Sequence, residues 1–120
     1  MASWSGDKAN PSPNSLAHEV VSHGIQEPLL RDEIYAQLMK QLNGNESPQS
    51  IAQAWKLIAL CLQFFPPNRD FSDYLLVFFR KFAPAGSKVR LRDKLYDIEY
   101  SGAASSPPSI DSIPQLVSGW

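Results

Sequence analysis

Residues 30–80 read LRDEIYAQLMKQLNGNESPQSIAQAWKLIALCLQFFPPNRDFSDYLLVFFR, and this stretch decides the fold. In three successive segments apolar residues recur at spacings of three and four, the pattern of an α-helix with a buried face. Asn43-Gly44 separates the first two segments and Pro66-Pro67 the last two, because glycine and proline interrupt helices. The stretch therefore predicts three helices joined by short turns.

The middle segment is predicted to be the central helix. Ser47 can cap its N-terminus, Pro48 suits its first turn, and Pro66 must stop it. Its apolar residues cover more than half of the helix circumference, which is typical of a helix packed on several sides.

The helices on either side are predicted to be amphipathic. The earlier one begins at Pro28 and runs to about Leu42. The later one spans Phe71–Phe82, with Asp70 as its N-cap. The predicted buried stripe of this later helix is Phe71, Tyr74, Leu75, Phe78 and Phe82. Ser72, Asp73, Arg80 and Lys81 are predicted to lie outside that stripe.

Two more helices are predicted at the ends of the chain. One spans Ser15–His23 with Gly24 as its stop, and the other spans residues 88–100 with Gly102 as its stop. The second has two narrow apolar edges, Leu91/Leu95/Ile98 and Val89/Tyr96/Tyr100. In the Pro- and Ser-rich tail of residues 103–120, one irregular turn can form from Ile110, Ile113, Leu116 and Val117. Because no alternating strand pattern is present, we expect an all-α fold, a compact bundle of four to five helices.

The composition favours a single domain. Of 120 residues, 43% are hydrophobic, which is enough for one core. We expect a disordered lead-in over residues 1–14, a helical domain over residues 15–117 and a tail over residues 118–120. No signal peptide is recognisable, and no apolar run approaches the roughly 20 residues of a membrane span. Together with the single cysteine, Cys61, this favours a cytoplasmic protein in which that thiol is buried and inert.

The motifs of common enzymes and cofactor sites are missing. The sequence has no Gly-rich phosphate loop, no zinc-binding spacing, no HExxH and no GxSxG. His18 and His23 stand five residues apart, which does not place them on one helix face as metal ligands. Asp32 and Glu33 point about 100° apart on a helix, so they cannot act as an acid–base pair. We therefore expect a protein that is not an enzyme and needs no cofactor.

Arg31 falls in the middle of an apolar stripe. Its guanidinium must therefore reach solvent, stack on an aromatic ring, or pair with an acid such as Glu27 or Glu19. A structural role is favoured over a binding role.

Basic residues are concentrated between positions 80 and 100. Six of them stand among three acids there, giving +3, whereas the rest of the chain carries −4. These six are Arg80, Lys81, Lys88, Arg90, Arg92 and Lys94, named here the basic set. They can form a solvated helix face, in which Asp93 and Asp97 neutralise Arg90 and Lys94, or a patch for an acidic protein partner. Nucleic acid is a poor candidate, because the chain is slightly acidic and no stacking aromatics interleave a basic groove.

Three segments in this order, LRDEIYAQLMKQL, AWKLIALCLQFFPP and FSDYLLVFFRK, resemble the core of the myosin tail homology 4 domain. Pro107-Pro108-Ser109 looks like the closing turn of that family. The resemblance covers roughly Ala17 to Leu116, and the domain looks short at its N-terminal end compared with the family.

The resemblance implies a helical interaction module. Such modules occur in the tails of unconventional myosins, in a plant-type kinesin and in some Rho GTPase-activating proteins, usually beside a FERM or RhoGAP domain. It implies binding to microtubules (tubulin) or to cargo-protein tails, with the basic set as candidate contacts, and an association with the cytoskeleton. The alternative is a regulatory scaffold domain of a Rho GTPase-activating protein whose catalytic domain lies outside this chain.

Overall fold

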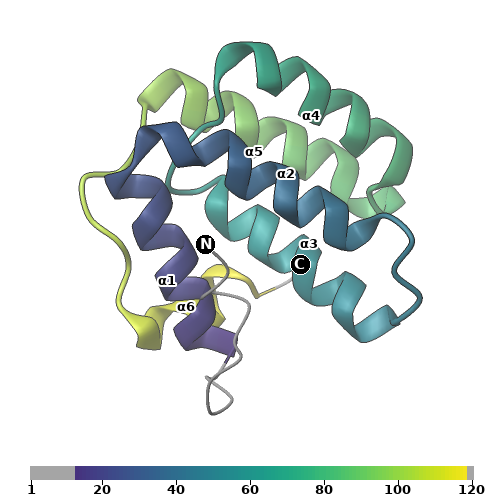
Figure 1. Cartoon of the computed structure of the whole chain (residues 1–120), viewed down its shortest axis with the longest axis horizontal. Helices are drawn as coiled ribbons and strands as arrows, with labels where there is room; N and C mark the ends of the chain where they lie inside the picture. The colour runs from purple at the N-terminus through teal and green to yellow at the C-terminus, as the bar shows by residue number, and fades with distance from the viewer. Residues whose placement is uncertain (1–12, 119–120) are drawn as a thin grey trace.

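The computed structural model describes residues 13–118, and all regular structure in that range is helical (Figure 1). This confirms the all-α prediction. The longer elements are α1 (Pro13–Gln26), α2 (Arg31–Leu42), α3 (Pro48–Cys61), α4 (Arg69–Phe82) and α5 (Lys88–Ser101). The shorter ones are α6 (Ile113–Leu116) and the 3-10 turns η2 (Pro28–Leu30), η3 (Ala85–Ser87) and η4 (Ile110–Ser112).

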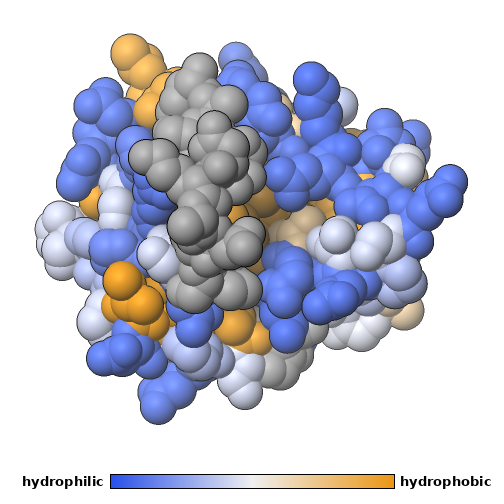
Figure 2. Space-filling view, turned by 60° about the horizontal axis from the view of Figure 1, so that its bottom comes forward, coloured by the Kyte–Doolittle hydropathy of each residue, from blue (hydrophilic) through white to orange (hydrophobic). Residues whose placement is uncertain are grey.

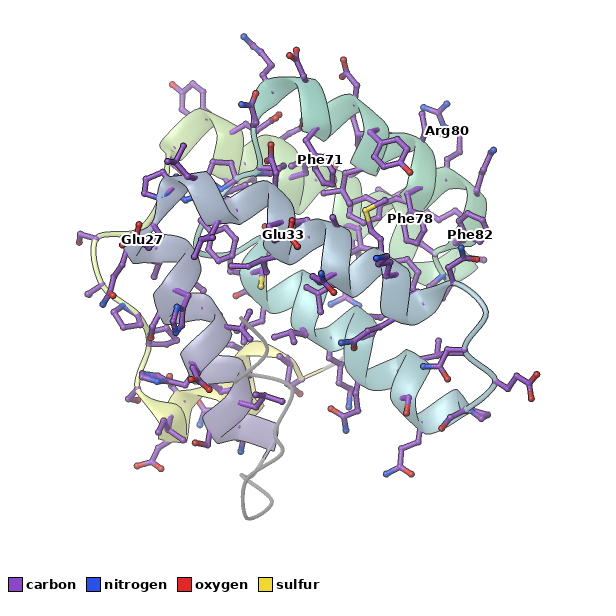
Figure 3. All side chains as sticks on the ribbon, in the orientation of Figure 1. Glu27, Glu33, Phe71, Phe78, Arg80 and Phe82 are labelled. Atoms are coloured by element: carbon purple, nitrogen blue, oxygen red, sulfur yellow. The ribbon has the colours of Figure 1, made fainter. Side chains whose placement is uncertain are left out.

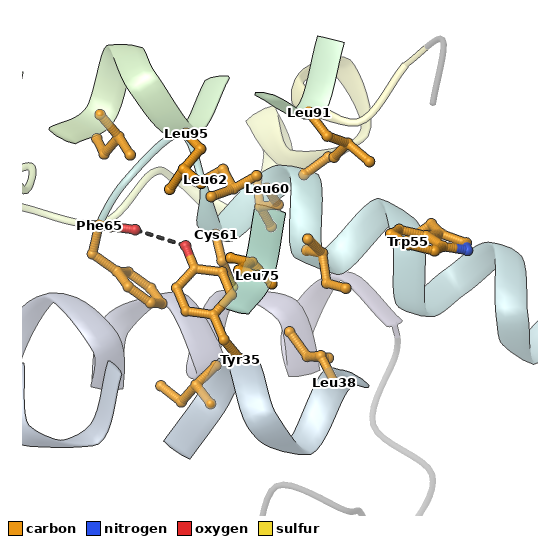
Figure 4. Packing of buried hydrophobic residues seen from close by; sticks show 14 of the residues in the cluster. Tyr35, Leu38, Trp55, Leu60, Cys61, Leu62, Phe65, Leu75, Leu91 and Leu95 are labelled. Carbon is orange, nitrogen blue, oxygen red and sulfur yellow. Dashed lines mark hydrogen bonds between the residues drawn. The ribbon is translucent and has the colours of Figure 1, made fainter. Parts of the chain in front are cut away.

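Helix α3 lies at the centre, as its apolar circumference predicts. Residues 58–62 are completely buried, and α2 packs along the length of α3 (Figures 1 and 4). Helix α1 packs against both of these helices and against α6, while α4 and α5 lie side by side. Since only residues 83–87 join α4 to α5, the two run antiparallel. One core therefore joins all six helices.

Several predicted helix ends are confirmed. The Ser47 side chain accepts a hydrogen bond from the Ser50 amide at 3.3 Å and caps α3. Helix α2 ends at Leu42, before Asn43-Gly44. Helix α5 ends one residue before Gly102, whose φ of 84° suits glycine.

Gly24 does not stop the first helix, so that prediction was wrong. Helix α1 starts at Pro13 and continues through Gly24 to Gln26. A Cβ atom at Gly24 would lie 2.2 Å from a ring carbon of Phe65, well inside van der Waals contact. The glycine therefore serves the close approach of α1 to Phe65, a requirement that the sequence around it does not reveal.

The turn between α3 and α4 also differs from the prediction. Helix α3 ends at Cys61 instead of running on to Pro66, although the Phe65 amide still donates to the Cys61 carbonyl at 3.0 Å. Helix α4 begins at Arg69, and its N-cap is Asn68, not Asp70. The Asn68 side-chain oxygen accepts a hydrogen bond from the Asp70 amide at 3.3 Å.

The buried face of α4 is rotated from the predicted one. Ser72, Leu75 and Phe79 are buried, whereas Tyr74 is 61% exposed and Phe82 57% exposed. The buried Ser72 hydroxyl donates a hydrogen bond to the Glu99 carboxylate of α5. Helix α5 thus supplies a hydrogen-bond acceptor for Ser72, a polar side chain that the sequence pattern placed outside the buried stripe.

The C-terminal tail folds back onto the bundle. Ile113 in α6 is 1% exposed, and Leu116 and Val117 pack on the core, as the predicted turn requires; Ile110 is 43% exposed. The Ala104 amide donates to the Phe64 carbonyl at 2.8 Å and ties the start of this tail to the α3–α4 turn. Most of the predicted disordered lead-in, residues 1–12, and Gly119 and Trp120 lie outside the described residues.

Candidate functional site

The first turn of α2 holds the end of α1 in place. Arg31 donates from Nε to the Gly24 carbonyl at 2.6 Å and from Nη2 to the Ile25 carbonyl at 3.2 Å. Its guanidinium carbon also lies 5.9 Å from the centre of the Phe65 ring. The predicted contact of Arg31 with an aromatic ring is confirmed. Its guanidinium N–H groups donate to main-chain carbonyls in the last turn of α1, where the prediction also allowed an acid.

Two more side chains of α2 hold the α3–α4 turn. The Tyr35 hydroxyl donates to the Phe65 carbonyl at 2.7 Å, inside the core (Figure 4). The Asp32 carboxylate accepts a hydrogen bond from the Asn68 amide at 2.6 Å. We name Gly24, Arg31, Tyr35 and Phe65 the Phe65 cluster. These four residues connect α1, α2 and the α3–α4 turn. The polar groups of Arg31 and Tyr35 form hydrogen bonds within the chain.

Burial suppresses the chemistry of the one thiol. Cys61 is completely buried, and burial raises its pKa far above the ordinary value of 9.0. The nearby Tyr35 is likewise buried, and burial raises its pKa well above 10.0. Among residues 13–118, no three His, Cys, Asp or Glu side chains are grouped so that they could hold a metal ion. Cys61 is therefore unsuited to act as a nucleophile, because its thiolate does not form near neutral pH.

The stability of the protein is expected to fall at alkaline pH. The Cys61 thiol ionises near pH 9 in the unfolded chain but stays protonated in the fold, so above that pH the unfolded state binds fewer protons. The free energy of unfolding should then decrease by up to about 1.4 kcal/mol per pH unit, and Tyr35 should add to this above pH 10. Urea denaturation at intervals from pH 8 to pH 11 measures it. Cys61→Ala should flatten the slope near pH 9, and an unchanged slope would contradict the assignment.

The basic set lies on the α4–α5 pair. Arg80 and Lys81 are exposed in the last turn of α4. The other four are in α5, where Arg90 and Arg92 are exposed and Lys88 and Lys94 half-buried. The structure thus brings all six onto two neighbouring helices.

The four basic residues of α5 nevertheless lie on two different sides of that helix. Its buried stripe is Leu91, Leu95 and Ile98. At 100° per residue, Arg90 and Lys94 fall on one side of that stripe, and Lys88 and Arg92 fall on the other. The second side faces α4, since Glu99 there accepts the hydrogen bond from Ser72.

Acidic residues accompany the first side. Arg90, Lys94, Asp93 and Asp97 line one open pocket of about 290 Å³, together with Gln63 and Leu116. The Gln63 side chain donates to the Leu116 carbonyl at 3.0 Å and fixes one wall. Asp93 pairs with Arg92, with 3.2 Å between the oxygen and Nη2. Both side chains are half exposed, so the pair contributes at most about 1 kcal/mol and leaves Arg92 accessible.

A larger pocket, of about 510 Å³, opens between α1, α3 and α6. Its lining is apolar at Leu16, Leu57 and Ile113 and amide-bearing at Gln41, Gln49 and Gln53. Figure 2 views the molecule from the side of α1 and α6, where hydrophobic side chains lie among hydrophilic ones. Lys56 is the only charged residue among the described residues that line this pocket, so it offers no acid–base pair.

Sequence reasoning missed the exposed apolar residues of α4 and of the outer edge of α5. In α4, Tyr74 and Phe82 were expected inside, and Val77 is 44% exposed. In α5, the edge formed by Val89, Tyr96 and Tyr100 is the exposed one, with Tyr100 96% exposed. Periodicity signalled both edges of α5 but could not say which would be buried.

No helix within residues 13–118 has the length and apolar character to cross a membrane.

Contacts of the LRDEIY and FFPP motifs hold this chain together as a compact helical module. The MyTH4 domain family model matches residues 17–113, and the chain belongs to this family. This confirms the resemblance to the myosin tail homology 4 domain.

Several relatives of this chain are myosins. It is 37% identical to the high molecular weight form of myosin-1 of Acanthamoeba castellanii over 90% of this chain, and 40% identical to unconventional myosin heavy chain 6 of Caenorhabditis elegans over 77%. A solved structure of the human myosin 7b C-terminal MyTH4-FERM domain in complex with the harmonin-a PDZ3 domain matches 94% of this chain, with a TM-score of 0.78 and 25% identity. The chain spans only 7% and 4% of the two relatives and 24% of the solved chain.

Proposed function

We propose that this chain is a non-enzymatic interaction module of an unconventional myosin tail, which binds microtubules or cargo-protein tails in the cytoplasm. Membership of the MyTH4 family carries the proposal. The solved relative supports it, because there a MyTH4-FERM unit is in complex with another protein's PDZ domain. In the parent protein we expect a FERM domain beside this module.

The relatives named above favour a motor tail over the alternative of a Rho GTPase-activating protein, since they are myosins. No residue arrangement described here favours the alternative. The sequence beyond Trp120 in the parent protein distinguishes the two, because it would resemble a FERM domain in one case and a RhoGAP domain in the other.

The distribution of charge supports an acidic partner. Residues 80–100 carry +3 against −4 for the rest of the chain, and every cation in them except Lys88 and Lys94 is exposed. An acidic protein surface, such as that of a microtubule, would be attracted to this end of the molecule at low salt.

Reversal of three charges on α5 should weaken microtubule binding. For Arg90→Glu/Arg92→Glu/Lys94→Glu we expect at least a roughly tenfold loss of apparent affinity at low salt, since three contacts of about 0.5 kcal/mol sum to about one factor of ten. Co-sedimentation with polymerised microtubules over a series of salt concentrations measures this loss.

The matched control is Lys40→Glu/Lys56→Glu/Arg69→Glu, which changes the net charge equally but at cations outside residues 80–100. It should retain most of the binding. If both triple variants bind alike, net charge and not the α5 surface is responsible. If the α5 variant binds as the wild type does, these residues are not the contact.

A further inference from the structure

The outward side of α4 carries an ordered sequence of side chains. Six exposed residues, named here the outer stripe, are Asp70, Asp73, Tyr74, Val77, Arg80 and Lys81. At 100° per residue they fall within about 120° of the helix circumference, opposite the buried Leu75 and Phe79. In Figure 3 Arg80 projects outward from α4, whereas Phe71 and Phe78 lie toward α2.

Charge changes sign along this stripe. Its acids are at the N-terminal end of α4 and its cations at the C-terminal end, an order that suits the helix dipole. The dipole, however, gives no reason to expose apolar side chains between them. Tyr74 is 61% and Val77 44% exposed, and Tyr74 is held by an edge-on contact with the Phe71 ring, 5.6 Å between centres.

When one copy of the stripe is turned end for end and laid against another, the acids of each copy face the cations of the other. We propose that the outer stripe binds the same stripe of a second copy of this chain, with the two α4 helices antiparallel about a two-fold axis at Val77. Asp73 and Arg80 lie on the same side of Val77 around the helix, about 6 Å and about 4.5 Å from it in opposite directions along the axis, so Asp73 of one copy meets Arg80 of the other. Tyr74 and Lys81 lie together on the other side, which brings the ring of one copy against the ammonium group of the other.

The size of the stripe sets the strength of this contact. A stable interface uses roughly 20 to 30 residues a side, and the outer stripe supplies six. The dimer is therefore weak, concentration-dependent and sensitive to salt. Arg80 and Lys81 belong to the basic set as well, but the proposal does not depend on the function proposed above, because the dimer is measured on the chain alone, without microtubules.

Sedimentation equilibrium of the whole chain, from about 10 µM to 1 mM at low salt, tests the proposal in the range expected for a small interface. The weight-average mass should rise toward twice the 13.4 kDa of one chain and fall back as salt is added. A mass that stays at one chain over the whole range would overturn the proposal and leave the stripe to a different partner.

Charge exchange makes the test specific. Asp73→Lys alone and Arg80→Glu alone should each weaken the dimer at least tenfold, because each places like charges opposite one another. The double variant Asp73→Lys/Arg80→Glu should restore it, and a mixture of the two single variants should form a heterodimer. Circular dichroism should show all of these variants folded, since both positions are exposed.

The controls separate this surface from others. Asp111→Lys and Lys40→Glu alter exposed charges on η4 and α2 by the same amount and should leave the dimer unchanged. A dimer that is indifferent to both single exchanges in α4, or that is not restored by the double variant, would overturn the proposed pairing. The α5 triple variant should still dimerise, so failure of microtubule binding and failure of dimerisation are distinguishable.

Discussion

Phe65→Ala is expected to lower the free energy of unfolding by about 4 kcal/mol, the upper part of the range for a buried phenylalanine. Phe65 is completely buried, its ring lies 5.5 Å from the Tyr35 ring, and its carbonyl accepts the Tyr35 hydroxyl. Loss of the ring also removes the surface over which the Arg31 guanidinium lies. Since domains of this size are stable by about 5–15 kcal/mol, this loss removes at least about a quarter of the total stability.

Urea denaturation followed by circular dichroism measures this loss. The matched control is Phe82→Ala, the same substitution at a ring that is 57% exposed, and it should cost no more than about 1 kcal/mol. Equal losses at the two positions would show that the Phe65 cluster does not hold the core together. Phe65→Leu, which keeps most of the volume, should fall between them.

Gly24→Ala should destabilise the protein by about 2 kcal/mol, even though alanine is the better helix former by about 1 kcal/mol. The added Cβ would lie 2.2 Å from Cε2 of Phe65, so the ring has to move. The ring is completely buried and is in contact with Tyr35 and Arg31, so its movement disturbs their packing as well. The midpoint of thermal or urea unfolding measures the effect. Gly86→Ala is the control, because a Cβ there meets nothing within 4 Å, and it should change stability by less than about 0.5 kcal/mol.

A double-mutant cycle identifies the cause. If the clash with Phe65 is responsible, Gly24→Ala should cost much less in a Phe65→Leu background, because the shorter side chain leaves room for the methyl group. We expect a coupling free energy of at least about 1 kcal/mol between the two positions. Additive effects would mean that the glycine is needed for another reason.

The fold was largely predictable because its signals are local. Several helix ends are set by residues that act within a few positions, such as the Ser47 cap and Gly102 after α5. The clearest error occurred where a distant segment decides. Gly24 looks like a helix stop from its neighbours alone, and only the approach of Phe65, 41 positions later, gives its real role.

The candidate site was predictable in composition but not in arrangement. The sequence identifies the six members of the basic set and places them late in the chain. Their division on α5 depends on which apolar edge of that helix is buried. Leu91, Leu95 and Ile98 face the core, so Arg90 and Arg92 fall on opposite sides of it.

By itself the sequence determined the family, the number and order of the long helices, and the central place of α3. These follow from periodicity, capping and the LRDEIY and FFPP motifs, all of which act over short distances. Only the tertiary structure decided the rotation of α4 and α5. Both helices have apolar residues on more than one face, so periodicity alone does not decide which face is buried. Packing against distant segments, including the hydrogen bond from Ser72 to Glu99, selects one and leaves Tyr74 and Val77 on the surface.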